Sequence, residues 1–183
     1  GLSQNIQMSQ IQDALLKFKS VPGRLELVNV GQDFTVIVDY AHEPLSLESV
    51  YKTAKLFNPR ELICVLGSQG GGRDKWKRSK MGEIAGKYCD EIVLTNEDPY
   101  DENPTQIVND VASGINTQSK VYKILDRKEA IQKAISLASK GDVVVLTGKG
   151  GEVWMCLKNN KKIPWNERTI VEEAIRSQAG HLT

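Results

Sequence analysis

Short apolar runs of the β-strand type alternate with segments of helical periodicity along almost the whole chain. Strands are expected over residues 25–30, 34–38, 62–66, 91–94, 121–125 and 143–146. Helices are expected over residues 9–18, 46–57, 77–88, 126–137 and 166–179, and another begins at Asn103-Pro104. A small hairpin is expected within 154–165, turned at Asn159-Asn160. This alternation predicts an α/β fold: a Rossmann-like, doubly wound, mainly parallel sheet of about six strands with helices on both faces.

Size, charge and cysteine content limit the class of protein. The 183 residues suffice for one medium domain, and 40% hydrophobic with 26% charged residues is typical of a soluble globular chain. A net charge of +1 favours neither nucleic acid nor a membrane surface as partner, and no apolar run could span a bilayer. Three separated cysteines and no secretory signal favour a cytoplasmic protein without disulfides or zinc, in which Cys64 and Cys89 are buried.

A glycine-rich turn followed by four cations comes directly after the strand expected at 62–66. Glycines let backbone N–H groups approach an anion, and the helix that begins next adds its positive end. Positive charge is brought to the same place by Arg73, Lys75, Lys77 and Arg78. The combination favours a phosphate or carboxylate ligand, although the Walker A pattern is absent from the sequence. The alternative is an ordinary strand-to-helix loop with a solvated basic helix start.

Polar residues also follow the strand expected at 34–38. Ligands gather at the carboxyl ends of parallel strands, so these residues are candidates for a site. The Asp39 carboxylate suits a pair of ribose hydroxyls, and the His42 ring suits a base or a phosphate. The alternatives are that Asp39 caps the next turn and that His42 is a solvated loop residue.

Acidic and glycine-rich segments follow two further strands. Glu97 and Asp98 suit an ammonium group, whereas two neighbouring carboxylates supply too few oxygens for a divalent metal. Gly148 opens a loop whose N–H groups suit a carboxylate, and Glu152 suits an amine. The alternative for the segment with Glu97 and Asp98 is a solvated acidic loop. The alternative for the loop from Gly148 to Glu152 is a tight turn into the hairpin. No Ser/His/Asp or Cys/His arrangement is apparent, and no metal site is expected in this chain.

Six motifs follow one another in a specific order. They are VPGR at 21–24, VDYAH at 38–42, GGGRDKWKR at 70–78, NEDP at 96–99, LDR at 125–127 and GKGGE at 148–152. Together they resemble the C-terminal domain of Mur ligases, most closely the MurE-type branch of UDP-N-acetylmuramoyl-tripeptide synthetases. The resemblance implies that residues 21–183 form this amino-acid-binding domain. Residues 1–20 resemble the last helix of the central domain and a linker, and a start without Met is expected of a piece of a longer protein.

The resemblance implies an ATP-dependent amide-bond ligase of peptidoglycan synthesis. In such enzymes ATP phosphorylates the carboxylate of UDP-MurNAc-L-Ala-D-Glu, and the amine of a diamino acid then attacks the acyl phosphate. The acyl-phosphate chemistry would take place in the central domain, which would also hold most of ATP and Mg²⁺. No catalytic residue is therefore expected in this chain, and the chain alone is expected to be inactive. Its expected partners are the protein's own N-terminal and central domains, and the enzyme is expected to be a monomer.

The resemblance also implies roles for individual residues. On the nucleotide side, Asp39 matches a ribose ligand and His42 matches a neighbour of the nucleotide. Two further cations, Lys75 and Arg78, match residues that neutralise phosphate charge. On the amino-acid side, Arg73 matches a ligand of the substrate carboxylate. Gly148 and Glu152 match residues that hold the far end of the diamino acid. Forked cations opposite carboxylate or phosphate are chemically consistent with both sets.

The chain departs from the family pattern at three places. Enzymes that add meso-diaminopimelate usually carry Asp-Asn-Pro-Arg where residues 97–100 read Glu-Asp-Pro-Tyr. Tyr100 removes the cation for a second carboxylate, and the neighbouring acids favour a substrate that ends in an ammonium, such as L-lysine or ornithine. Gly151 replaces a usual histidine, and Glu43 replaces a usual threonine.

Two other functions remain open from the sequence. One is a related ligase with this domain, such as a folylpolyglutamate or cyanophycin synthetase. The other is a non-catalytic module that binds a nucleotide or an amino acid, because the chain has no P-loop.

Overall fold

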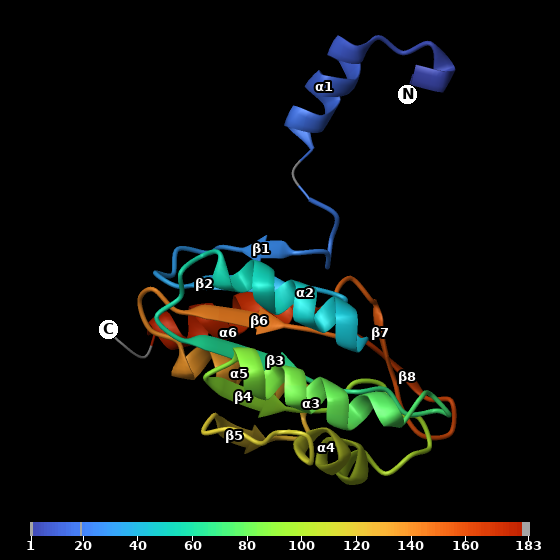
Figure 1. The fold of residues 1–183 in the computed structure, drawn as a ribbon, viewed down its shortest axis with the longest axis vertical. Coiled ribbons are helices and arrows are strands. Elements are labelled where there is room, and N and C mark those ends of the chain that lie inside the picture. The colour runs from blue at the N-terminus through green and yellow to red at the C-terminus, as the bar shows by residue number, and fades with distance from the viewer. Residues whose placement is uncertain (1, 19, 181–183) are drawn as a thin grey trace.

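A computed structural model describes residues 2–18 and 20–180, and its centre is one six-stranded sheet (Figure 1). The strands are β1 (Glu26–Val28), β2 (Thr35–Val38), β3 (Leu62–Leu66), β4 (Glu91–Leu94), β5 (Lys120–Lys123) and β6 (Val143–Leu146). Their order across the sheet is β1-β2-β6-β3-β4-β5. All neighbours are parallel except β1, which runs antiparallel to β2. The predicted fold class is confirmed.

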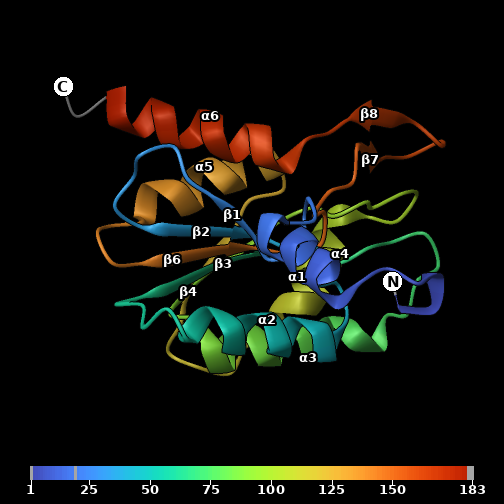
Figure 2. The same ribbon diagram turned by 90° about the horizontal axis from the view of Figure 1, so that it is seen from above.

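Helices cover both faces of the sheet (Figure 2). They are α1 (Met8–Lys17), α2 (Pro44–Lys55), α3 (Trp76–Tyr88), α4 (Pro104–Ala112), α5 (Arg127–Leu137) and α6 (Glu167–Gly180), with a short 3-10 turn η1 (Leu2–Gln4) before them. One face is packed by α2, α3 and α4, the other by α5 and α6. Because both faces are covered, β3, β4 and β6 are buried along their whole length. The continuous apolar run of β3 is the sequence pattern expected of such a strand.

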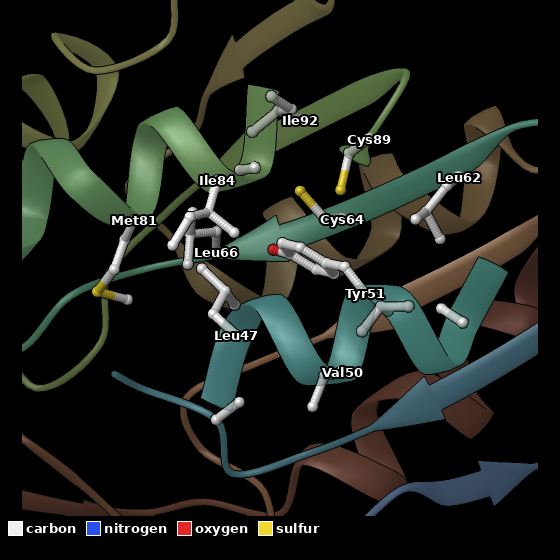
Figure 3. Close-up of a cluster of buried hydrophobic side chains, with 14 of the residues drawn as sticks. Leu47, Val50, Tyr51, Leu62, Cys64, Leu66, Met81, Ile84, Cys89 and Ile92 are labelled. Atoms are coloured by element: carbon white, nitrogen blue, oxygen red, sulfur yellow. The ribbon is translucent and has the colours of Figure 1, made fainter. Parts of the chain in front are cut away.

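The core under α2 and α3 contains two of the three cysteines (Figure 3). Cys64 in β3 and Cys89 after α3 lie among aliphatic side chains beside the ring of Tyr51, and all three residues are buried. Both cysteines are free thiols, which confirms their predicted role as small buried hydrophobes.

Helix starts follow the capping signals in the sequence. The Asn103 side chain accepts a hydrogen bond from the N–H of Thr105 (2.9 Å), and the Asp126 carboxylate accepts one from Glu129 (3.0 Å). Each cap satisfies N–H groups that have no partner within the helix, so α4 and α5 begin where the sequence predicts.

A hairpin of β7 (Trp154–Cys156) and β8 (Lys162–Pro164) follows β6 and stands beside the carboxyl ends of the main sheet (Figure 1). It turns at Asn159 and Asn160, whose φ angles are +59° and +55°. Asparagine tolerates this left-handed region better than most residues, which confirms the predicted turn.

Helix α1 lies apart from the packed layers (Figure 1). It has no buried residue, and Leu15, Leu16 and Phe18 at its end are 67%, 85% and 61% exposed. In the part of the chain that the structure describes, no helix has the length and apolarity needed to cross a membrane.

Candidate functional site

The loops after β2, β3, β4 and β6 meet at one edge of the sheet, which we call the site edge. Parallel strands direct their carboxyl ends to the same edge, and the sequence candidates follow these strands. Close packing joins the loops: a Cβ at Gly67 would overlap Glu97, and a Cβ at Gly70 would overlap the Pro99 carbonyl group. The candidate residues therefore belong to one continuous surface.

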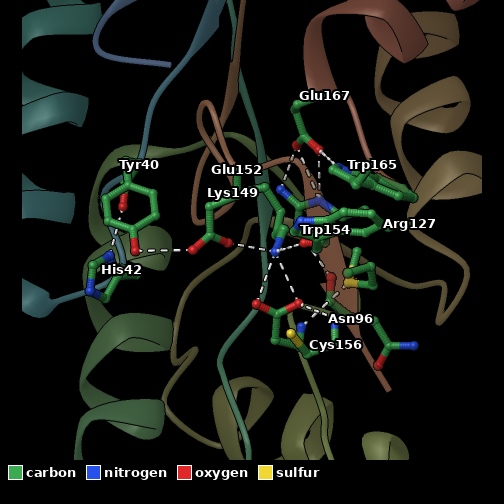
Figure 4. Close-up of polar contacts among 12 residues, drawn as sticks. Tyr40, His42, Asn96, Arg127, Lys149, Glu152, Trp154, Cys156, Trp165 and Glu167 are labelled. Atoms are coloured by element: carbon green, nitrogen blue, oxygen red, sulfur yellow. Dashed lines mark hydrogen bonds and ion pairs between the residues drawn. The ribbon is translucent and has the colours of Figure 1, made fainter. Parts of the chain in front are cut away.

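Lys149, in the loop after β6, is the central cation of this edge (Figure 4). Its buried ammonium donates to both carboxylate oxygens of Asp98 (2.9 Å each), to Glu152 Oε2 (2.5 Å) and to the carbonyl oxygen of Trp154 (2.7 Å). Burial lowers the pKa of Lys149, but the hydrogen bonds to Glu152 and Asp98 outweigh it and raise the pKa above its ordinary value. Lys149 therefore stays charged and ties three chain segments together.

Asp98, which the sequence analysis expects to suit an ammonium group, pairs with an ammonium group of this chain. Its carboxylate is paired with the Lys149 ammonium and also accepts the N–H of Cys156 (2.7 Å). Asp98 has a φ of +46° and is 3% exposed. Its charge is thus neutralised within the protein, so the acids of this loop do not by themselves favour a substrate that ends in an ammonium.

Glu152 keeps one side open to solvent. Its Oε2 atom pairs with Lys149, its Oε1 atom accepts the hydroxyl of Tyr40 (3.1 Å), and 33% of its side chain is exposed (Figure 4). Burial, followed by the charge of Glu152, raises the pKa of Tyr40, so the phenol remains a donor at neutral pH. Glu152 is therefore held in a fixed orientation at the surface of the site edge.

Glu97 is buried without a hydrogen-bond partner. It is 1% exposed, and neither carboxylate oxygen meets a donor among the described residues. Burial raises its pKa to about 7, against the lowering effect of the Arg127 and Lys149 charges. Gly148 lies directly over this carboxylate with a φ of +101°, and a Cβ at that position would overlap Glu97 Oε2. Glu97 and Gly148 are thus brought together, as a carboxyl group below a loop that only glycine fits.

Arg127 is a buried residue whose role the sequence does not reveal. It pairs with Glu167 (2.6 Å) and donates to the backbone carbonyls of Asn96 (3.2 Å) and Thr147 (2.7 Å). The Trp165 indole N–H also donates to Glu167 (2.6 Å). One guanidinium therefore fixes the loops after β4 and β6 against α6 (Figure 4). The sequence signal is its place in the LDR motif after β5, where a conventional helix start is the simpler interpretation.

Asp39 accepts hydrogen bonds from two backbone N–H groups. Its carboxylate accepts the N–H of Ala41 (2.8 Å), which matches the capping alternative of the sequence analysis, and also the N–H of Leu25 (2.7 Å), just before β1. His42 is half-buried, with Nδ1 2.8 Å from the Tyr40 carbonyl oxygen and its ring edge-on to the Tyr40 ring. Their roles toward a nucleotide stay predictions.

The four cations after β3 divide into an inner and an outer pair. Arg78 is 1% exposed and donates to the Gln69 carbonyl, Glu102 and Asp110, whereas Lys77 donates to the His42 carbonyl (3.1 Å) and to Glu43. Arg78 thus holds the glycine-rich loop against α4, and its contact with phosphate stays a prediction. The outer pair is exposed and consists of Arg73 and Lys75.

Tyr100 connects the glycine-rich loop with the hairpin. Its φ is +49°, its ring packs against Gly71, and its N–H donates to the Cys156 carbonyl (3.3 Å). A hydrogen bond to Cys156 and burial raise the pKa of Tyr100, and the nearby Arg73 charge lowers it. Tyr100 therefore contacts both the glycine-rich loop and the hairpin.

The segment before β1 also reaches the site edge. Gly23, with a φ of +67°, packs against Gly151 so closely that a Cβ would overlap its backbone. The Arg24 guanidinium lies 4.3 Å from the centre of the Tyr40 ring, a cation–π distance. The linker that leads to α1 is thus in direct contact with the GKGGE loop.

The residues present fit one side of a nucleotide. His42 and Lys75 offer a ring and a cation at the site edge, and each Asp39 oxygen has accepted only one N–H. Across residues 2–18 and 20–180, no three His, Cys, Asp or Glu side chains gather as metal ligands.

Comparison with known proteins identifies the family. The model of the Mur ligase, glutamate ligase domain matches residues 23–150. The chain is 45% identical to a UDP-N-acetylmuramoyl-L-alanyl-D-glutamate–2,6-diaminopimelate ligase of Clostridium acetobutylicum, with 96% of this chain and 36% of the relative aligned. It is also 45% identical to a UDP-N-acetylmuramyl-tripeptide synthetase of Borreliella burgdorferi, over 94% and 34% of the two chains.

Solved structures give the same result. A UDP-N-acetylmuramoyl-L-alanyl-D-glutamate–2,6-diaminopimelate ligase superimposes with a TM-score of 0.80 at 32% identity, covering 97% of this chain and 36% of that one. Folylpolyglutamate synthase of Mycobacterium tuberculosis, at 22% identity and a TM-score of 0.60 over 78% and 33% of the chains, shares the fold. The chain spans about a third of the length of these relatives. It belongs to the Mur ligase family and carries that family's glutamate ligase domain.

Proposed function

We propose that this chain is the C-terminal, amino-acid-binding domain of a UDP-N-acetylmuramoyl-tripeptide synthetase that works in the cytoplasm. The enzyme would join a diamino acid to UDP-MurNAc-L-Ala-D-Glu. The proposal rests on one observation: the family motifs lie in loops that interlock at a single sheet edge, with the carboxylates of Asp98 and Glu152 oriented by Lys149. The relatives of 45% identity are named as a diaminopimelate ligase and a tripeptide synthetase, which favours this branch over folylpolyglutamate synthesis.

The two sides of the site edge would divide the work. Arg73 is exposed and suits the α-carboxylate of the amino acid, and Glu152 suits an ammonium group of the same substrate. On the other side, His42 and Lys75 would contact the nucleotide. ATP, with Mg²⁺, would supply activation of the dipeptide carboxylate and would be held mainly by the rest of the enzyme.

The residues between these two sides would hold the loops in position and would take no part in the chemical step. Arg127 and Lys149 hold the loops after β4 and β6, so the substrate meets a preorganised surface. The contact of Gly23 with Gly151 would transmit movements of the linker to the amino-acid loop.

The test uses the whole enzyme that contains this chain. UDP-MurNAc-L-Ala-D-Glu, ATP, Mg²⁺ and single amino acids from a panel are incubated with it, and phosphate release and product mass are measured. We expect a tripeptide product with at least one diamino acid and none with glutamate. Formation of a glutamyl product on a folate, without a muramoyl product, would show that the proposal is wrong.

A further inference from the structure

An open groove lies between the hairpin and the loops after β4 and β6. Its volume is about 360 Å³, and its walls include Tyr100, Glu152, Trp154, Cys156 and Lys162. It adjoins the Lys149 cluster, because Asp98 and Glu152 also line it. A small polar ligand at the site edge would therefore extend into this groove.

The register of the hairpin directs Lys162 into the groove. Cys156 pairs with Lys162, and Met155 pairs with Ile163. Residues opposite each other in an antiparallel pair share one face, and neighbours along a strand alternate. Met155 is 3% exposed and belongs to the inner face, so Cys156 and Lys162 share the outer face that lines the groove.

Backbone hydrogen bonds hold this face in place. The N–H of Cys156 donates to Asp98 (2.7 Å), and its carbonyl accepts the N–H of Tyr100 (3.3 Å). Since Asp98 is itself paired with Lys149, the strand that carries Cys156 is fixed to the central cation of the site. Lys162 thus projects from a hairpin that is anchored to the site edge.

The charged side chains of Glu152 and Lys162 line the groove and differ in whether they are already paired within the protein. Glu152 is held by Lys149 and Tyr40 and keeps a third of its side chain exposed. Lys162 is exposed, and within the described residues no carboxylate lies at ion-pair distance from its ammonium. One free cation and one oriented carboxylate on the walls of the same groove suit a ligand head that carries both a carboxylate and an ammonium.

We propose that Lys162 binds the distal carboxylate of the amino-acid substrate, while Glu152 faces the distal ammonium. The substrate class is then a diamino dicarboxylic acid, whose methylene chain would lie along the Trp154 side chain. This inference rests on the proposed function and refines it. It replaces the preference for lysine or ornithine that Tyr100 suggests from the sequence.

The experiment compares two substrates of the whole enzyme, meso-diaminopimelate and L-lysine, by phosphate release and product mass. The unaltered enzyme should use diaminopimelate with a kcat/KM at least about tenfold higher. Lys162→Met should raise the KM for diaminopimelate by about tenfold or more, because a charge-assisted hydrogen bond is lost. The KM for L-lysine should change less than about twofold. Lys162→Arg should restore most of the discrimination.

Lys161→Met is the matched control, because Lys161 lies next to Lys162 on the hairpin but does not line the groove. It should leave both KM values unchanged. An unaltered enzyme that prefers L-lysine, or a Lys162→Met enzyme whose two KM values rise equally or not at all, overturns the assignment of Lys162 while tripeptide synthesis stands. An enzyme that adds neither amino acid to the muramoyl dipeptide overturns the proposed function itself.

Discussion

Lys149 Nζ lies 2.9 Å from each carboxylate oxygen of Asp98, and the two side chains are 0% and 4% exposed. An ion pair buried this deeply stabilises the folded protein little more than a pair of apolar side chains would. Removal of one partner, however, leaves an uncompensated charge in the interior. The pair is therefore sensitive to single substitutions in either residue.

Lys149→Met should destabilise the chain by about 3–5 kcal/mol, because Asp98 then remains charged and buried without its cation. Asp98→Asn combined with Lys149→Met should lose less than the sum of the two single variants. Denaturant unfolding of the four proteins measures this coupling. The exposed Lys161→Met serves as the control, and additive losses would argue against a tight pair.

The pKa of Glu97 gives stability a defined pH dependence. Burial raises this pKa from 4.5 to about 7, so the folded state favours the protonated carboxyl. The stabilisation is fully present below pH 4.5 and is lost as pH rises through 7, because the folded state holds a proton that the unfolded state releases. The total effect is on the order of 3 kcal/mol.

Glu97→Gln should remove this dependence, since an amide of similar shape does not titrate. Unfolding free energies of both proteins at intervals from pH 4.5 to 8 measure the effect. Their difference should grow with pH in favour of the variant. Parallel curves across this range would show that Glu97 titrates alike in both states.

Much of the fold follows from the sequence because its signals are local. The strands expected at 62–66, 91–94 and 143–146 match β3, β4 and β6 residue by residue. Asn103 and Asp126 cap the helices that follow them, since each cap needs only the next three residues. The antiparallel direction of β1 is less evident, because it depends on how tightly the chain turns between residues 28 and 35.

The site is less predictable because its contacts join distant segments. A lysine between glycines is typical of a solvated loop, yet Lys149 is buried by partners 51 residues away as well as by Glu152. Arg78 is similar: a cation in the first turn of a helix usually points to solvent, but this one meets Glu102 and Asp110. Burial of a charge depends on tertiary partners, which residue spacing does not encode.

Arg73 and Lys75 should affect different substrates of the whole enzyme. Arg73→Ala should raise the KM for the amino acid by about tenfold, because a forked contact to a carboxylate is lost, and leave the KM for ATP nearly unchanged. Lys75→Ala should do the reverse. Initial-rate kinetics with each substrate varied in turn gives both values.

Neither change should affect folding. Arg73 is exposed, and the pair of Lys75 with Glu102 spans 3.4 Å at the surface, where such pairs contribute less than about 1 kcal/mol. Equal unfolding midpoints for both variants and the unaltered chain check this. If both variants raised the same KM, the proposed division of the site edge would be wrong.

Gly148→Ala should be more harmful than the same change at another glycine with positive φ. At Gly148 the φ of +101° disfavours any side chain, and a Cβ would also overlap the Glu97 carboxylate. Gly141 has a φ of +84° with no atom within 4 Å of an added Cβ, so Gly141→Ala carries the backbone cost alone. We expect a loss of about 1–2 kcal/mol at Gly141 and at least about 3 kcal/mol at Gly148, measured by denaturant unfolding.

Because the excess at Gly148 arises from contact with Glu97, Glu97→Ala in the same chain should recover part of it but none of the backbone cost. Equal losses at the two glycines would mean that the loop after β6 moves away from Glu97 without resistance.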